Sequence, residues 1–185
     1  STLFRLRILH NRTMKKFHCF LICGENGVGK TTTAHILQEL TDYPVYNFAD
    51  SLKEFFAKDV IFGASIENRH MKELVRPALI SLANDFKAVF GKDFFAREVY
   101  RRMGEANRCI IGDLRFAEEL EFIEENFITY DIIYITKDIQ HEPTKQFPFL
   151  ADKSIYLIEN TGTLEELREK IDSVYQENKY KCSKL

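Results

Sequence analysis

The chain has 185 residues, of which 45% are hydrophobic and 29% are charged, proportions that are typical of a globular domain large enough to bury a full core. No stretch approaches the roughly 18 uninterrupted apolar residues of a membrane span, so we expect no membrane partner. With 26 basic against 28 acidic residues, the chain lacks the basic excess of a general nucleic-acid-binding protein.

Basic residues gather at the start of the chain. Residues 1–18 hold five lysines and arginines and no acid, which leaves the remainder with 21 basic against 28 acidic residues. We expect residues 1–16 to be an N-terminal extension, residues 17–178 to form one folded domain, and residues 179–185 to be a C-terminal tail. An organellar targeting segment is the alternative interpretation of the basic start.

The cysteines indicate a reducing environment. Cys19, Cys23, Cys109 and Cys182 are too few and too scattered for a disulfide framework, so we expect reduced thiols and a cytoplasmic location. The spacing of the first two fits none of the usual zinc patterns, and core positions on a strand are the favoured interpretation. The last three residues, Ser-Lys-Leu, spell a peroxisomal address, which applies only if the source is eukaryotic and Leu185 is the true terminus.

Strand-like and helix-like segments alternate from residue 17 onward. A short apolar run predicts a buried strand at 17–23, and the sequence after the following glycine-rich loop predicts a helix at 31–40. A second short strand is expected at 46–49. The helix expected at 51–62 carries an apolar stripe made of Leu52, Phe55, Phe56 and Val60.

Proline and aspartate mark the next two helices. Pro77 is expected to open a helix because proline favours the first helical position. Asp93 is expected to cap the following helix, which runs through Met103. The stripe expected to be buried in the first of these helices is Leu79, Leu82, Ala83, Phe86, Val89 and Phe90.

The last third of the chain completes the alternation. Strands are expected at 108–112, 132–136 and 155–158, with an acidic helix at 116–125. Thr163-Leu-Glu-Glu166 predicts a capping box that opens the last helix. This order predicts an α/β fold, a three-layer domain with a parallel sheet of about five strands and helices on both faces.

Residues 24–31, Gly-Glu-Asn-Gly-Val-Gly-Lys-Thr, form a complete Walker A pattern between a predicted strand and a predicted helix. The pattern is typical of the P-loop NTPase fold. Its glycines let backbone amides face the phosphates of ATP, and the helix dipole adds to that field. Lys30 is expected to reach the β and γ phosphates, and the Thr31 hydroxyl to ligate Mg²⁺. The residues expected to bind the nucleotide are Glu25, Asn26, Gly27, Val28, Gly29, Lys30, Thr31 and Thr32.

Two acidic residues follow predicted strands. Asp113 is expected to orient Mg²⁺ or its water, and Arg115, two residues on, to clamp a phosphoryl oxygen; a surface pair at a turn is the alternative. Asp50 follows the second strand, where an acceptor would enter, and is expected to take the acceptor's proton or bind its hydroxyl. The alternative for Asp50 is an N-cap of the helix that begins at Ser51. The expected catalytic set is Lys30, Asp50, Asp113 and Arg115.

Phosphoryl transfer between two anions needs several cations close to the transferred group. Lys53, Arg76, Arg97 and Arg115 lie near predicted helix starts or strand ends, and we expect them, with Asp50, to bind the acceptor. Each one taken singly is more often a solvated surface charge. Arg76 directly precedes Pro77, which predicts a place at a helix N-terminus.

With these residues in place, residues 15–174 resemble the deoxynucleoside monophosphate kinases of bacteriophages. Beyond the Walker A segment, the resemblance depends on Phe48-Ala-Asp-Ser-Leu-Lys53, Arg76-Pro-Ala-Leu79, Phe90-Gly-Lys-Asp-Phe-Phe-Ala-Arg97, Ile111-Gly-Asp-Leu-Arg-Phe116 and Ile158-Glu-Asn-Thr-Gly-Thr-Leu-Glu-Glu-Leu167. It implies a P-loop kinase domain that transfers the γ-phosphoryl group of ATP to a (deoxy)nucleoside monophosphate. Arginines such as Arg76, Arg97 and Arg115 would hold the acceptor phosphate. We expect a monomer or a homodimer.

The sequence departs from that family in one place, and two alternatives stay open. Residues 137–148 lie where such kinases carry a lid but contain no arginine, so Lys137, His141 or Lys145 would have to serve. Animal phosphomevalonate kinases share the Leu-Lys, Asp-x-Phe-Phe, Asp-x-Arg and Ile-Glu-Asn elements and are the alternative among enzymes. The alternative of another class is a non-catalytic P-loop switch or scaffold, against which the acceptor-side cations argue.

Overall fold

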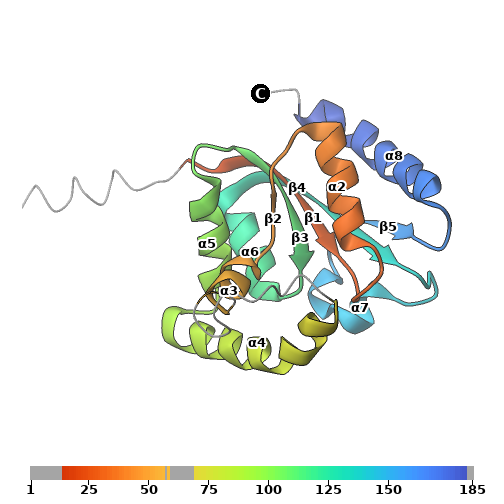
Figure 1. Cartoon of the computed structure of the whole chain (residues 1–185). Helices are drawn as coiled ribbons and strands as arrows, with labels where there is room; N and C mark the ends of the chain where they lie inside the picture. Colours follow the sequence, from red (N-terminus) through yellow and green to blue (C-terminus); the bar gives the residue numbers. More distant parts are fainter. Residues whose placement is uncertain (1–13, 57, 59–68, 183–185) are drawn as a thin grey trace, which may run out of the picture.

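A computed structural model describes residues 14–56, 58 and 69–182, and these residues form an α/β fold around one parallel sheet (Figure 1). The sheet has five strands in the order β2-β3-β1-β4-β5, and every strand pair is parallel. The sequence-based expectation of a three-layer fold with about five parallel strands is confirmed. The strands are β1 Lys16–Cys23, β2 Val45–Tyr46, β3 Arg108–Leu114, β4 Phe127–Thr136 and β5 Ile155–Glu159.

Helices cover both faces of this sheet. In Figure 1, α2 and α8 lie side by side over one face, while α5 and α6 lie over the other. The helices are α2 Lys30–Thr41, α3 Asp50–Phe55, α4 Arg69–Phe90, α5 Phe94–Met103, α6 Ala117–Asn126, α7 Pro143–Gln146 and α8 Leu164–Cys182, and a short 3-10 helix, η2, spans Pro148–Leu150.

The alternation of side chains along β1 divides the core into two parts. Cys19, Leu21 and Cys23 face the layer of α5 and α6, whereas Phe20 and Ile22 face the layer of α2 and α8. Successive side chains of a strand point to opposite faces, so a strand covered on both sides must be apolar throughout. The interpretation of the strand cysteines as core residues is confirmed, because Cys19, Cys23 and Cys109 are fully buried free thiols.

Pro77 does not open a helix. It lies inside α4, which begins at Arg69, so the expected helix start at this position was wrong. A proline inside a helix leaves the carbonyl four residues earlier without its hydrogen bond. Pro77 lies on the exposed side of α4, where its ring does not enter the core. Arg76 therefore lies on an exposed helix face and not at a helix N-terminus.

The apolar stripe expected along this helix is only partly buried. Leu79, Leu82, Ala83 and Phe86 pack against the core on the α5 side. Val89 and Phe90 are 73% and 53% exposed, so their expected burial was wrong. The ring of Phe90 instead stacks on Phe94 at 5.1 Å between centroids, because the chain turns at Gly91 and leads directly into α5.

The chain after β2 leaves the sheet earlier than the sequence predicted. β2 ends at Tyr46, because the backbone amides of Phe48 and Ala49 donate to the Asp113 carboxylate and not to a neighbouring strand. α3 begins at Asp50 with Ala49 as its N-cap, so the alternative of Asp50 as the cap residue was wrong. Of the stripe expected in the helix at 51–62, Leu52 and Phe56 are buried and Phe55 is exposed; Val60 lies outside the described residues.

The expected helix caps have mixed outcomes. Thr163 and Glu166 form the predicted capping box, with the Thr163 amide 2.9 Å from Glu166 Oε2 and the Glu166 amide 3.2 Å from Thr163 Oγ1. Asp93 occupies the N-cap position of α5, but its side chain makes no capping hydrogen bond. Within the described part of the chain, no helix is both long and apolar enough to cross a membrane.

Two isoleucines of β4 differ in burial, so the contribution of the core to stability can be measured on one strand. Ile133 is fully buried between β1 and β5, whereas Ile128 is 54% exposed. Replacing Ile133 by alanine leaves a cavity, so Ile133→Ala should lower the free energy of unfolding by about 3 kcal/mol. Ile128→Ala should lower it by less than about 1 kcal/mol. Urea unfolding of both variants measures the difference, and equal losses would contradict the buried position of Ile133.

Candidate active site

The loop between β1 and α2 has the shape that its sequence predicts. Gly24 and Gly29 adopt φ angles of 145° and 107°, which side chains rarely allow. A Cβ atom at Gly24 would lie 2.3 Å from the Ile135 carbonyl oxygen, and one at Gly29 would lie 2.5 Å from Asn160 Nδ2. Glycine is therefore required at both positions by close packing as well as by conformation. The loop ends where α2 begins at Lys30, so the free amides of a helix N-terminus face it.

Lys30 curls back across this loop. Its Nζ donates to the carbonyl oxygen of Gly24 at 2.7 Å and to that of Glu25. Burial and, less strongly, the positive charges of Arg115 and Arg76 lower the pKa of Lys30 to about 8. The lysine is thus held by two carbonyls inside a cluster of like charges, which makes it ready to accept an anion.

Asp113 lies at the C-terminal end of β3 and binds the backbone beside it. Its Oδ1 accepts the amide of Phe48 at 2.7 Å, and its Oδ2 accepts the amide of Ala49 at 3.2 Å. Burial raises the pKa of Asp113, and these two amides and the charges of Lys53 and Arg115 oppose the increase. A carboxylate has about four lone-pair sites, so Asp113 retains acceptor capacity for a water or a metal-bound water.

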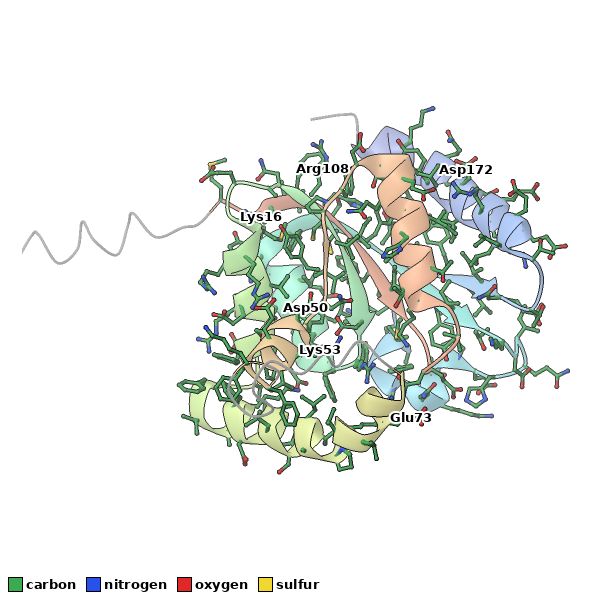
Figure 2. All side chains as sticks on the ribbon, viewed as in Figure 1. Lys16, Asp50, Lys53, Glu73, Arg108 and Asp172 are labelled. Atoms are coloured by element: carbon green, nitrogen blue, oxygen red, sulfur yellow. The ribbon has the colours of Figure 1, made fainter. Side chains whose placement is uncertain are left out.

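The acceptor-side candidates Asp50 and Lys53 both come from α3 (Figure 2), which begins directly after the two amides that bind Asp113. Asp50 Oδ2 accepts the backbone amide of Asn47 at 2.9 Å, and Asp50 Oδ1 accepts the Asn47 side-chain amide at 3.2 Å. Lys53 is close enough for its charge to lower the pKa of Asp113. Glu54 and Arg102 tie α3 to α5 through two hydrogen bonds of 2.9 Å each. The helix that carries Asp50 and Lys53 is therefore fixed from both ends.

Arg115 reaches the nucleotide loop from the other side. Its Nη2 donates to Asn26 Oδ1 at 3.3 Å, and its charge acts on the pKa of both Lys30 and Asp113. The alternative of a simple Asp113–Arg115 surface pair does not describe this geometry. Asp113 binds the amides of Phe48 and Ala49, whereas Arg115 contacts Asn26.

Arg76 and Arg97 have different surroundings. Arg76 is exposed on α4, but it lies near enough to lower the pKa of Lys30, and α4 begins on the α7 side of the molecule in Figure 1. Arg97 lies in the first turn of α5, where its side chain donates to the Phe90 carbonyl and pairs with Asp93 at 3.5 Å. The charges of Arg115 and Arg76 thus act on the pKa of Lys30, and those of Lys53 and Arg115 act on the pKa of Asp113. Arg97 contacts Phe90 and Asp93 instead.

The segment between β4 and β5 also reaches the nucleotide loop. His141 Nε2 lies 3.5 Å from Glu25 Oε1, and both side chains are about half exposed. Lys145 pairs with Glu142 on α7 at 3.4 Å. Of the three basic residues considered for a lid, His141 contacts the loop in the described part of the chain, and its chemical role stays a prediction.

Two residues of the site were missed by the sequence interpretation. Asn160 Nδ2 donates to the Val28 carbonyl at 2.7 Å, and the Asn160 amide donates to the Thr136 carbonyl at 2.7 Å. Asn160 therefore fixes the nucleotide loop to the end of β4. Glu119, buried in the first turn of α6, accepts the amides of Arg115 and Phe116. The signals were the Ile158-Glu-Asn segment and the spacing Phe116-x-x-Glu119, which is the second half of a capping box.

The chain has the fold of P-loop kinases. A shikimate kinase from Acinetobacter baumannii in complex with shikimate superposes with a TM-score of 0.50 at 16% identity, over 90% of this chain and 96% of that one. A gluconokinase from Sinorhizobium meliloti superposes with a TM-score of 0.49 at 11% identity, over 91% of this chain and 99% of that one. No family model matches the sequence, and no curated protein sequence matches it. Similarity at these identities concerns the fold alone.

The lowered pKa of Lys30 predicts how ATP affinity depends on pH. A triphosphate binds the charged lysine and raises its pKa. The affinity for ATP is therefore highest when the pH is below the Lys30 pKa of about 8, and it is lost as the pH rises above that value. The dissociation constant of a fluorescent ATP analogue should increase on the order of ten-fold between about pH 7 and about pH 9.5. Lys30→Met should bind weakly at every pH. A flat profile in the unmodified protein would show that Lys30 is not the group that titrates.

Proposed function

We propose that this protein is an ATP-dependent kinase that transfers the γ-phosphoryl group to a (deoxy)nucleoside monophosphate. The observation that supports it best is that Arg115, two residues after Asp113, contacts the glycine loop at Asn26 at 3.3 Å and so brings a second cation to the loop that holds Lys30. Lys53 on α3 and Arg115 after β3 act on Asp113, and Arg76 on α4 acts on Lys30 together with Arg115. Cations gathered from three elements suit a reaction in which two phosphorylated molecules must approach each other.

The donor side fits ATP. The loop of residues 24–31 is shaped by glycines at positions where a Cβ would collide, and Lys30 is held by carbonyls that phosphate oxygens can replace. The residues proposed to bind the nucleotide are those from Glu25 to Thr32. Thr31 and Asp113 would hold Mg²⁺, which would supply charge neutralisation at the transferred group when bound.

The acceptor side is proposed to lie between α3, α4 and the end of β3. Lys53, Arg76 and Arg115 would hold the acceptor phosphate and orient it for in-line attack, since catalysis of phosphoryl transfer is largely positioning and charge stabilisation. Asp50 would bind a hydroxyl group of the acceptor or take its proton. The hydrogen bonds from Asn47 keep the Asp50 carboxylate in place for either task.

The proposal is tested by measuring ADP release with and without candidate acceptors. We expect one or more nucleoside monophosphates to increase ADP release at least about 100-fold over slow acceptor-free hydrolysis. Lys30→Ala should abolish this activity while keeping the thermal unfolding temperature, because its charge serves phosphates and not the core. Stimulation by phosphomevalonate alone would replace the proposed acceptor. No stimulation by any acceptor would indicate a nucleotide-binding switch or scaffold.

Arg76 and Arg97 provide a matched pair of variants for the acceptor site. Arg76→Ala should lower kcat/KM for the acceptor about 30- to 1000-fold, because a charged partner of the acceptor phosphate is lost. The Kd for ATP should change little.

The contacts of Arg97 with Phe90 and Asp93 already engage its side chain. If Arg97 also holds the acceptor, as the resemblance implies, Arg97→Ala should show the same kinetic loss as Arg76→Ala. A loss of stability with unchanged kinetics would restrict Arg97 to the turn between α4 and α5. Unchanged kinetics in Arg76→Ala would remove Arg76 from the site.

A further inference from the structure

Glu119 is a buried carboxylate that the proposed reaction does not use directly. It lies in the first turn of α6 and is 4% exposed. A single oxygen, Oε2, accepts the amide of Arg115 at 2.9 Å and the amide of Phe116 at 3.0 Å. These two consecutive amides belong to the turn between β3 and α6, which carries the Arg115 side chain.

We propose that Glu119 is a positioning residue that holds Arg115 over the nucleotide loop. This inference rests on the proposed function, because it assigns Arg115 a place at the transferred phosphoryl group. The guanidinium of Arg115 is exposed and contacts the loop through Asn26 at 3.3 Å. An exposed arginine has many rotamers, so the direction of its side chain depends on how firmly its backbone is held.

The surroundings of Glu119 indicate that more than helix capping is involved. Ordinary capping needs only the amide of the residue before the helix, whereas Glu119 also binds the amide of Arg115, one residue further out. Burial and, less strongly, the nearby charge of Asp113 raise the pKa of Glu119 to about 8. A carboxyl group kept in such a buried position is explained by the geometry that it imposes on the turn through its two hydrogen bonds.

Two substitutions separate the hydrogen bonds of Glu119 from its titratable carboxyl group. Glu119→Gln keeps an oxygen that can accept both amides, whereas Glu119→Ala removes it. Glu121→Ala is the matched control, because Glu121 is exposed on the same helix. If Glu119→Ala does not fold, Glu119→Asp replaces it, since the shorter side chain withdraws the acceptor oxygen but keeps a carboxyl group. Thermal unfolding of each variant establishes that the fold is retained.

A double-mutant cycle with Arg115→Ala tests whether Glu119 acts through Arg115. Glu119→Ala and Arg115→Ala should each lower kcat/KM by a similar factor, about 10- to 100-fold. The double variant should be no worse than Arg115→Ala alone. Glu119→Gln and Glu121→Ala should stay within about 3-fold of the unmodified protein. Multiplied effects in the double variant, or an equal loss in Glu119→Gln, would overturn the proposal.

A second measurement needs no acceptor, so it remains valid if the proposed function fails. The Arg115 side chain contacts the nucleotide loop at Asn26 Oδ1, so Arg115→Ala should weaken the binding of a fluorescent ATP analogue at neutral pH about 10-fold. Glu119→Ala should weaken it to a similar extent, and Glu119→Gln should not. Unchanged binding in Glu119→Ala, beside weakened binding in Arg115→Ala, would show that Glu119 does not position Arg115.

Discussion

The two hydrogen bonds from the amides of Phe48 and Ala49 to Asp113 hold the two sides of the site together. One side is the sheet, where β3 pairs with β1 and so places Asp113 beside the loop that contains Lys30. The other side is α3, which begins at Asp50 immediately after the two bound amides. Each amide that binds Asp113 is withdrawn from strand pairing, so β2 is short and the chain turns into α3. The same carboxylate thereby sets the end of a strand, the start of a helix and the spacing between them.

Charge at the site is balanced by opposing groups that burial brings together. Asp113 and Glu119 are acids whose pKa values burial raises, and Lys30 is a base whose pKa burial lowers. Arg115 is the link between them, because its backbone binds Glu119 while its charge acts on the other two. In a low-dielectric setting such interactions are stronger than in water, so the cations are held in place before a phosphorylated ligand arrives.

Residues in and after β4 and after β5 contact the nucleotide loop. Asn160, after β5, binds the Val28 carbonyl and lies against Gly29. The Ile135 carbonyl on β4 lies where a side chain at Gly24 would go, and His141, beyond β4, pairs with Glu25. These contacts restrict the loop at both ends and at its outer edge. A rigid loop on a central strand can present its amides without reorganising, which is what electrostatic preorganisation requires.

The sequence by itself determined the order of strands and helices, the parallel fold and the nucleotide loop, because apolar periodicity and the Walker A spacing are local patterns. It was wrong about Pro77, since proline favours a helix start but lies here on the exposed side of α4, inside a helix whose other side packs against the core. It also overestimated the burial of Val89 and Phe90, because periodicity does not tell where the core ends.

Only the tertiary structure decided which charges meet. Arg76 and Arg97 look alike in the sequence, yet one acts on Lys30 and the other binds Phe90 and Asp93. The partners of Asp113 and Asn160 lie 65 and 132 residues away in the chain, and contacts across such separations depend on how the layers pack.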